Sequence, residues 1–367
     1  MSDTREHRCW AEIDLGAIRS NARVAHEHLG PDRSLLAVIK ANGYGHGLRA
    51  VAKALEHEAQ LFGVANLEEA IEARTAITQP VMILGPALPS ERREIVERGF
   101  IASISSYEEA REFNAVADGT AALLACVIDT GMGRMGIAEH DAAEQLQRIA
   151  ALPCVRIHSV SSHLPVADED ADYSRDQLAR FRALIAAVRA AVAGDYLVHT
   201  LPTAGVFRFA DSAFDLARAG LMLYGATSLG EFQPLLTPAM TLKSRVALLR
   251  NVPPGTSISY GRTFMTSRDT RIATLSAGYA DGVPRALSGR GEVLIGGRRC
   301  PLLGRVTMDL IMVDVTDVRN VSVGDEAVLI GRQNEEQILV SEVAHWASTI
   351  AWEIFTGIGS RVARVYV

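Results

Sequence analysis

The sequence predicts a TIM-like (βα)8 barrel followed by a mostly β C-terminal domain. Over the first two thirds of the chain, eight short apolar runs alternate with helix-like segments, and after about Glu231 the pattern changes to strands and turns. Alternation of this kind indicates parallel strands joined by helical crossovers. Eight strands over about 200 residues are typical of a closed α/β barrel. An open doubly wound sheet is the competing interpretation.

The barrel strands are expected at 35–40, 61–65, 81–85, 101–105, 121–129, 155–163, 197–203 and 214–218. Helical spacing follows most of them, at 67–77, 106–117, 141–150 and 172–193. The segment 67–77 shows this best, with apolar residues three and four positions apart and acidic residues near its start.

In the second domain, strands are expected at 241–251, 271–276, 292–295, 305–315 and 326–330, with one helix at 340–356 and an alternating segment at 361–367. Pro234 and Pro238 interrupt regular structure between the two patterns. We therefore expect a barrel domain at 10–233 and a β-rich domain at 234–367, with residues 1–9 packed against the latter.

Composition excludes several classes of protein. The 367 residues carry 37 Lys and Arg against 43 Asp and Glu, a net charge of −6, which argues against nucleic-acid binding. The longest apolar run, 121–128, is too short to span a membrane, and the N-terminus does not resemble a signal peptide. Four scattered cysteines indicate free thiols in a reducing compartment. We expect a cytoplasmic globular protein.

Polar residues follow the predicted barrel strands, whose C-terminal ends share one rim where barrel enzymes perform their chemistry. Lys40 ends the first strand, and Arg134, His163 and Arg218 follow or end later ones. A lone lysine or histidine at such a place is usually structural. A functional site is indicated only because several such residues are expected at the same rim. The pattern Gly131-x-Gly133-x-x-Gly136 resembles a dinucleotide-binding loop, but the acidic residue that should follow about 20 positions later is absent.

The loops after strands seven and eight suggest a phosphate site. They offer the Thr203 hydroxyl and the backbone N–H groups around Gly220 and Leu221, at the place where barrels often bind phosphate. A phosphate at the rim together with a lysine at the end of strand one indicates pyridoxal phosphate held covalently by Lys40.

At these residues the sequence resembles the alanine racemase family, the barrel-type (fold type III) pyridoxal-phosphate enzymes. Two segments carry most of the resemblance: Ala37-Val-Ile-Lys-Ala-Asn-Gly-Tyr-Gly-His-Gly and Asp129-Thr-Gly-Met-Gly-Arg-Met-Gly. In the second domain Ser259-Tyr-Gly-Arg-Thr-Phe, Gly278-Tyr-Ala-Asp-Gly and Gly304-Arg-Val-Thr-Met-Asp also match. The similarity covers essentially the whole chain.

The resemblance implies an isomerase that interconverts L- and D-alanine by a two-base mechanism and supplies D-alanine for peptidoglycan. Inversion needs a proton donor and acceptor on each face of the α-carbon. By this resemblance Lys40 serves the D-isomer and Tyr260 the L-isomer. Tyr260 would reach the site of a neighbouring subunit, which implies a homodimer.

The resemblance also assigns the binding residues. Arg134 and the backbone N–H of the neighbouring subunit's Met308 would bind the substrate carboxylate. Arg218 would contact the cofactor's pyridine nitrogen, and His163 would contact Arg218. The phosphate would be held by Tyr44, Thr203, Gly220 and Leu221, and the substrate entrance would be lined by Tyr279, Asp168 and Thr307.

The chain departs from the family pattern at five positions. Val127 replaces a lysine that many members carry as a carbamate supporting the substrate-binding arginine, and Ser360 replaces a tyrosine that contacts the phosphate. Pro202-Thr203 replaces Asn-Ser, and Thr307 replaces a frequent cysteine.

Three alternative functions stay open: a racemase of serine or another small amino acid, a non-catalytic pyridoxal-phosphate-binding protein, and a basic amino-acid decarboxylase. Tyr260 argues against the second, and Arg218 against the third. The acidic run around Asp168 is interpreted as a solvated loop, and no motif requires a metal.

Overall fold

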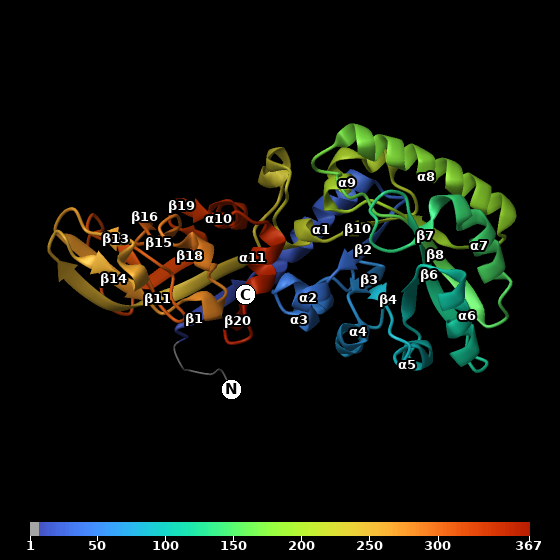
Figure 1. Ribbon diagram of the computed structural model, residues 1–367, viewed down its shortest axis with the longest axis horizontal. Coiled ribbons are helices and arrows are strands. Elements are labelled where there is room, and N and C mark those ends of the chain that lie inside the picture. The colour runs from blue at the N-terminus through green and yellow to red at the C-terminus, as the bar shows by residue number, and fades with distance from the viewer. Residues whose placement is uncertain (1–6) are drawn as a thin grey trace.

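The computed structural model describes residues 7–367 and shows two lobes side by side along the longest axis (Figure 1). In one lobe, eight parallel strands pair in sequence order, and the pairing of the first with the last and of β5 with β6 closes the ring. The closure confirms the predicted barrel and excludes the open sheet. The barrel strands are β2 (Ser34–Val38), β3 (Leu61–Val64), β4 (Val81–Pro86), β5 (Ile101–Ile104), β6 (Ala122–Asp129), β8 (Val155–Ser161), β9 (Leu197–His199) and β10 (Leu216–Ala219), with β7 (Ile137–Ala138) added beside β6.

Helices surround the barrel, and polar caps start several of them. The side chains of Asn66, Ser106 and Asp170 accept hydrogen bonds from backbone N–H groups three residues later, which satisfies donors that a helix start leaves unpaired. The helices of this lobe are α1 (Leu15–Leu29), α2 (Lys40–Tyr44), α3 (Leu48–Ala54), α4 (Leu67–Arg74), α5 (Arg92–Glu97), α6 (Tyr107–Val116), α7 (Ala142–Ala150), α8 (Ala171–Ala191) and α9 (Thr203–Arg208).

The other lobe is built on a mixed sheet in the order β16-β15-β18-β11-β1-β20, from which β14, β17 and β19 branch. A separate hairpin, β12–β13, lies at the outer end of this lobe in Figure 1. The strands are β1 (Cys9–Ile13), β11 (Met240–Val252), β12 (Ser257–Ile258), β13 (Phe264–Met265), β14 (Thr270–Leu275), β15 (Glu292–Ile295), β16 (Arg298–Pro301), β17 (Ile311–Asp314), β18 (Glu326–Gln333), β19 (Glu336–Ile338) and β20 (Ala363–Tyr366).

The start of the chain differs from the expected division. Residues 10–13, assigned to the barrel domain by sequence, lie in β1, which pairs with β11 and β20 of the second lobe. Within the expected segment 1–9, residues 1–6 lie outside the described residues, whereas the His7 and Arg8 carbonyls accept hydrogen bonds from Arg245 and Ser244. A strand this short is stabilised only by pairing, and the long strand β11 offers the partner. The boundary at 233/234 stays a prediction.

Two further predictions about the second lobe are wrong in detail. The single helix expected at 340–356 is two helices, α10 (Val340–Ala347) and α11 (Ala351–Gly357), because Ser348 takes a left-handed conformation with φ of 55°. The N–H groups of Ser348 and Thr349 then bond back to His345 and Ala344, as in the motif that commonly ends helices. The strand expected at 305–315 begins only at Ile311, because a tight turn at 307–310 interrupts it.

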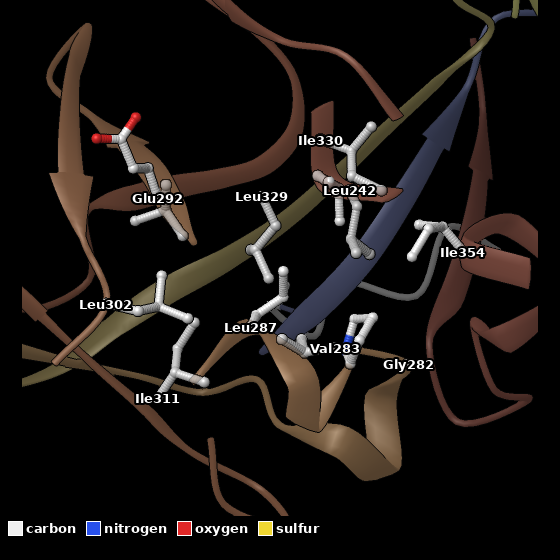
Figure 2. Close-up of a pocket in the computed structure, with 13 residues that line it drawn as sticks. Leu242, Gly282, Val283, Leu287, Glu292, Leu302, Ile311, Leu329, Ile330 and Ile354 are labelled. Atoms are coloured by element: carbon white, nitrogen blue, oxygen red, sulfur yellow. The ribbon is translucent and has the colours of Figure 1, made fainter. Parts of the chain in front are cut away.

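An apolar hollow inside the second lobe is part of the packing of that lobe. Figure 2 shows aliphatic side chains converging on it, among them Leu242, Leu287, Leu302 and Ile311. Most of these residues also belong to the large hydrophobic core, which runs continuously from the barrel into the second lobe. Within the described residues, no helix is long and apolar enough to cross a membrane.

Candidate active site

Lys40 begins an unusual turn directly after β2. Ala41, Asn42, Gly43 and Tyr44 all have left-handed backbone conformations, with φ between 51° and 59°. For residues other than glycine this conformation costs roughly 1–2 kcal/mol each, so the surrounding structure must hold it. The turn places Lys40 just beyond the C-terminal end of the first barrel strand, as the sequence predicts.

Contacts from both lobes hold this turn. On the barrel side, the Glu69 carboxylate accepts hydrogen bonds from the backbone N–H groups of Asn42 (3.3 Å) and Ala65 (2.9 Å). On the other side, α11 contacts α2, and the Arg364 guanidinium donates to the Gly45 carbonyl at 2.9 Å. A Cβ on Gly45 would lie 2.2 Å from the Phe355 carbonyl oxygen. Glycine is therefore required where the second lobe meets the lysine turn.

Arg218, on β10, is held by three acceptors at the rim. Its Nη2 donates to the Thr200 carbonyl (2.8 Å), to the Ser162 carbonyl and to Nδ1 of His163 (3.0 Å). Burial, followed by the positive charge of Arg218, lowers the pKa of His163 well below its usual value, so the ring is neutral and its Nδ1 accepts. Within residues 7–367, the buried Nε of Arg218 has no hydrogen-bond partner. A bound water or ligand that accepts a hydrogen bond would satisfy this N–H group.

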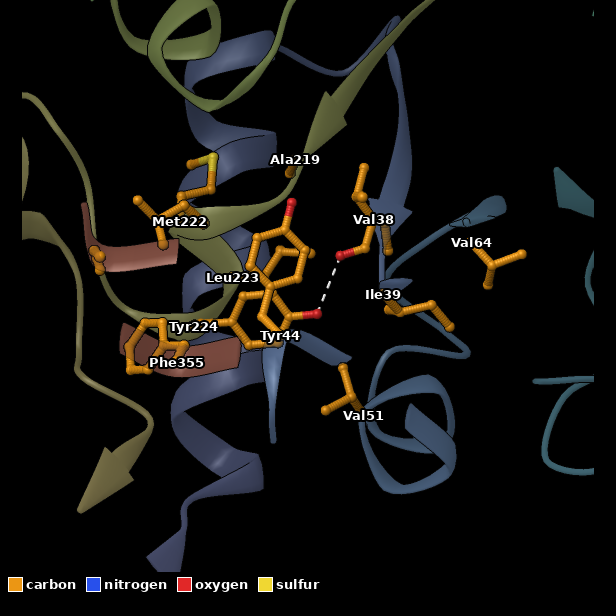
Figure 3. Packing of buried hydrophobic residues seen from close by; sticks show 14 of the residues in the cluster. Val38, Ile39, Tyr44, Val51, Val64, Ala219, Met222, Leu223, Tyr224 and Phe355 are labelled. Carbon is orange, nitrogen blue, oxygen red and sulfur yellow. Dashed lines mark hydrogen bonds between the residues drawn. The ribbon is translucent and has the colours of Figure 1, made fainter. Parts of the chain in front are cut away.

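The residues expected to hold a phosphate lie together. The Thr203 hydroxyl oxygen accepts hydrogen bonds from the N–H groups of Gly220 (3.2 Å) and Met222 (3.3 Å). A Cβ on Gly220 would lie 2.8 Å from the Tyr44 hydroxyl. Figure 3 shows Tyr44 beside Tyr224; the two rings stack with centroids 4.7 Å apart, and the Tyr224 hydroxyl donates to the Val38 carbonyl. Leu221 begins the buried turn Leu221–Tyr224 beside them.

The surroundings of Lys40 at the rim lower the pKa of its amine. Burial lowers the pKa of Lys40 most, followed by the positive charge of Arg134. Glu69 acts in the opposite direction, and Arg218 adds a smaller lowering effect. Burial, then Arg134, also lowers the pKa of Arg218 to about 10. At neutral pH that guanidinium is still protonated. The cluster therefore combines a fixed cation with an amine that loses its proton more easily than a solvated lysine.

Arg134 lies on a loop that Asp129 organises. The Asp129 carboxylate accepts hydrogen bonds from the N–H groups of Gly131, Met132 and Gly133 at 2.8–2.9 Å. Although burial acts to raise the pKa of Asp129, these donors lower it overall. The Arg134 side chain is exposed. Val127 lies two residues before this loop on β6 and offers no charge to support it.

Sequence reasoning missed Gln177 on α8. Its side-chain amide donates to the Thr130 hydroxyl (2.7 Å) and to the His163 carbonyl (2.9 Å), and Thr130 in turn bonds to Ser162. The network joins the loop that carries Arg134 to the strand end that carries His163. In sequence, Gln177 is one polar residue within a helical pattern, and nothing marks it as buried.

The second-lobe residues form a group of their own. The N–H groups of Tyr279 and Ala280 donate to the carbonyls of Thr307 and Met308, each at 3.0 Å. Arg361 clamps the same segments, with Nε bonded to Asp281 (2.6 Å) and Nη2 to Asp309 (2.8 Å). Tyr260, Met308 and Tyr279 are 72%, 53% and 43% exposed.

Within one chain, Tyr260 and Lys40 lie in different parts of the molecule. Tyr260 begins the turn between β12 and β13, at the outer end of the second lobe, whereas α2 lies where the lobes meet (Figure 1). Asp168 lies before α8 on the barrel and uses its carbonyl to accept from Arg208. Ser360 is exposed beside Arg361. Among the described residues, no three His, Cys, Asp or Glu side chains are grouped to hold a metal ion.

Two family models match consecutive parts of the chain. Residues 13–228 match the family described as alanine racemase, N-terminal domain, and residues 239–366 match alanine racemase, C-terminal domain. An alanine racemase of Symbiobacterium thermophilum is 41% identical over 364 residues, covering 97% of this chain and 96% of that protein.

Solved structures match along the whole chain. Alanine racemase from D-cycloserine-producing Streptomyces lavendulae is 36% identical with a TM-score of 0.93, covering 99% of this chain and 98% of that one. The Bartonella henselae enzyme with covalently bound pyridoxal phosphate is 29% identical with a TM-score of 0.89, covering 99% and 100%. The chain belongs to the alanine racemase family.

Proposed function

We propose that Lys40 and Tyr260 are the two bases with which this chain, an amino-acid racemase, interconverts L- and D-alanine with pyridoxal phosphate as its cofactor. One observation carries the proposal beyond family membership. The buried Nε of Arg218 lacks an acceptor, and it belongs to the same rim as an amine whose pKa is lowered. We expect the D-alanine formed to supply peptidoglycan synthesis.

The residues present fit the cofactor. The unpartnered Arg218 Nε suits a ring nitrogen that accepts a hydrogen bond, and Tyr44, Thr203, Gly220 and Leu221 suit the phosphate. Lys40 would hold the aldehyde carbon covalently. When bound, pyridoxal phosphate withdraws electron density from the substrate's α-carbon, which makes the α-proton removable by a side-chain base.

Arg218 favours racemisation over side reactions. A guanidinium with a pKa of about 10 keeps its proton at neutral pH, so its Nε only donates. Arg218 would therefore leave a cofactor ring nitrogen unprotonated, and such a ring would withdraw less electron density than a protonated one. We expect this weaker electron withdrawal to disfavour transamination, because transamination needs a longer-lived negative charge at the α-carbon.

The chain's own groups then move the proton. Unprotonated Lys40 takes the α-proton of D-alanine, and Tyr260 returns a proton on the opposite face; the reverse direction exchanges the two roles. Arg134 is suited to a carboxylate because its guanidinium offers a fork of donors. The Met308 N–H would share that carboxylate, and Tyr279, Asp168 and Thr307 would line the approach.

This mechanism requires a second copy of the chain. Tyr260 and Met308 are both exposed in the second lobe. Tyr260 begins the turn between β12 and β13 at the outer end of that lobe, whereas α2, which begins at Lys40, lies where the lobes meet. A symmetric dimer presents the same surface of each copy to the other, so each copy would complete its partner's site. The exposure of Tyr260 and Met308 supports a homodimer in which each of the two sites combines residues of both chains.

The test is isotope exchange in D2O with the cofactor-loaded protein. Loss of optical rotation and gain of α-deuterium are followed for L-alanine, D-alanine and L-serine. Tyr260→Phe should slow proton removal from L-alanine by about 10²–10⁴-fold, the usual contribution of a general base. Tyr107→Phe, on the outer helix α6, is the matched control and should leave the rate unchanged.

Three results would contradict the proposal. Unchanged racemisation by Tyr260→Phe would remove the second base. Constant optical rotation of alanine despite bound cofactor would reject the activity. Faster turnover of serine than of alanine would show that serine, and not alanine, is the preferred substrate.

A further inference from the structure

Ser259, which precedes Tyr260, has a backbone conformation that side chains rarely adopt. Its φ is 65° and its ψ is −176°, a region occupied essentially by glycine alone. Such strain persists only where surrounding contacts impose it, and it concentrates at functional sites. Here it lies one residue from the most exposed large hydrophobic side chain of the described chain, Tyr260.

Two contacts with the neighbouring loop hold Ser259 in this conformation. Its hydroxyl donates to the Arg305 carbonyl at 2.6 Å. Gly304 makes the approach possible, since a Cβ there would lie 2.6 Å from the Ile258 carbonyl oxygen and 2.9 Å from the Ser259 Cβ. On the far side of Tyr260, the Arg305 guanidinium lies against Gly261. Arg305 therefore contacts the residues on both sides of the tyrosine.

The hairpin has other sources of stability. β12 and β13 pair through Ser257–Met265 and Ile258–Phe264, and Ile258 belongs to a small core with Val252, Ile272 and Leu303. The Ser259 hydroxyl is therefore not needed to form the hairpin. What it determines is the direction in which the chain leaves β12, and hence where Tyr260 points.

From this geometry we infer that Ser259 is a positioning residue for Tyr260: its bond to the Arg305 carbonyl imposes the strained backbone that sets the phenol at the angle needed for proton transfer. The inference rests on the proposed role of Tyr260 as a base. The same loop carries Met308, three residues after Arg305, so one element would position both the base and the carboxylate donor.

The two substitutions Ser259→Ala and Ser259→Gly distinguish the effect of losing the hydroxyl from the effect of relieving the backbone strain. Alanine keeps the Cβ penalty and loses the hydrogen bond, so the backbone should relax and displace Tyr260. Glycine adopts the same φ and ψ without strain, so it should retain more of the original direction. Thr256→Val is the matched control, since it removes a hydroxyl-to-carbonyl bond, Thr256 to Pro253 at 2.8 Å, beside the same hairpin.

The measurement is the ratio of α-deuterium gained with retention to inversion, starting from D-alanine in D2O with the cofactor-loaded enzyme. Lys40 exchanges the α-proton of D-alanine whether or not Tyr260 is in place, whereas inversion needs Tyr260. A change that only lowers the amount of folded enzyme leaves this ratio unchanged. We expect the ratio to rise about tenfold in Ser259→Ala, about threefold in Ser259→Gly and not at all in Thr256→Val, a tenfold change being what about 1.4 kcal/mol of mispositioning produces.

Several outcomes would overturn the inference. A ratio in Ser259→Ala equal to that of the unchanged protein would do so, and so would an unchanged ratio in Ser259→Gly if the alanine variant does not fold. A ratio that rises only on tenfold dilution would assign Ser259 to subunit assembly instead. Tyr260→Phe distinguishes the underlying proposal: if it retains inversion, Tyr260 is not the base, whatever the Ser259 variants show.

Discussion

The turn after Lys40 and the turn around Tyr260 use similar backbone conformations in opposite surroundings. Both contain non-glycine residues with positive φ. The Lys40 turn is pinned by Glu69 from the barrel and by Arg364 from the second lobe of the same chain. The Tyr260 turn is held from one side, by the loop of Arg305, and its phenol is 72% exposed. The Lys40 turn is thus held by contacts from both lobes of one chain, whereas Tyr260 is presented outward.

The strongest test asks whether Lys40 and Tyr260 act together from two different chains. Lys40→Ala and Tyr260→Phe should each be almost inactive alone, because each removes one base from every site. Co-expressed with different tags, they should recover about a quarter of full activity, since half of the dimers are mixed and each mixed dimer has one intact site. The measurement is the racemisation rate of the mixture against each variant.

A mixture no more active than its parts would mean that both bases come from one chain. The control is a mixture of Lys40→Ala with the unchanged protein. Its activity should follow the fraction of unchanged chains.

A smaller loss of racemisation is expected when Arg218, at the rim of the barrel, is replaced. Arg218→Glu replaces the buried donor with a carboxylate and leaves the Ser162 and Thr200 carbonyls without their partner. Racemisation should fall about 100-fold, within the range of a lost general electrostatic contact, while pyruvate formed per racemisation event should rise. Both are measured by NMR on the same sample. Arg111→Glu, exposed on α6, is the matched charge reversal; equal partitioning in both variants would reject the role given to Arg218.

A smaller change is expected when Arg134, which influences the pKa of Lys40, loses its charge. Arg134 lowers the pKa of Lys40, so Arg134→Gln should raise it. Covalent capture of pyridoxal phosphate by cofactor-free protein needs the neutral amine and therefore increases with pH through the Lys40 pKa. The capture profile of the variant should lie at higher pH than that of the unchanged protein, below the range of a solvated lysine in both cases. A profile at the same or lower pH would exclude this influence of Arg134.

Much of the barrel half is predictable from the sequence. The eight apolar runs became strands in the expected order, and the rule that strand ends share a rim brought Lys40, His163 and Arg218 together. Thr203 and Gly220, which the sequence assigns to one phosphate site, lie within hydrogen-bond distance of each other, and their role toward a phosphate stays a prediction. These predictions succeed because side-chain periodicity and strand direction are local properties of the chain.

Other features could not be predicted because they depend on segments far apart in sequence. Gln177 bonds to Thr130 across 47 positions, and nothing near Gln177 indicates that it is buried. The break at Ser348 depends on a left-handed conformation that serine adopts as rarely as most residues. The pairing of β1 with β20 joins residues from opposite ends of the chain.

By itself, the sequence determined the barrel, the β-rich second lobe and the identity of the groups at the rim, since each follows from spacing and residue type. Only the tertiary structure decided where those groups point. The left-handed turn that aims Lys40 and the strained Ser259 that directs Tyr260 are both unfavourable locally. They exist because distant contacts impose them, as the Arg305 carbonyl does for Ser259 from 46 positions along the chain.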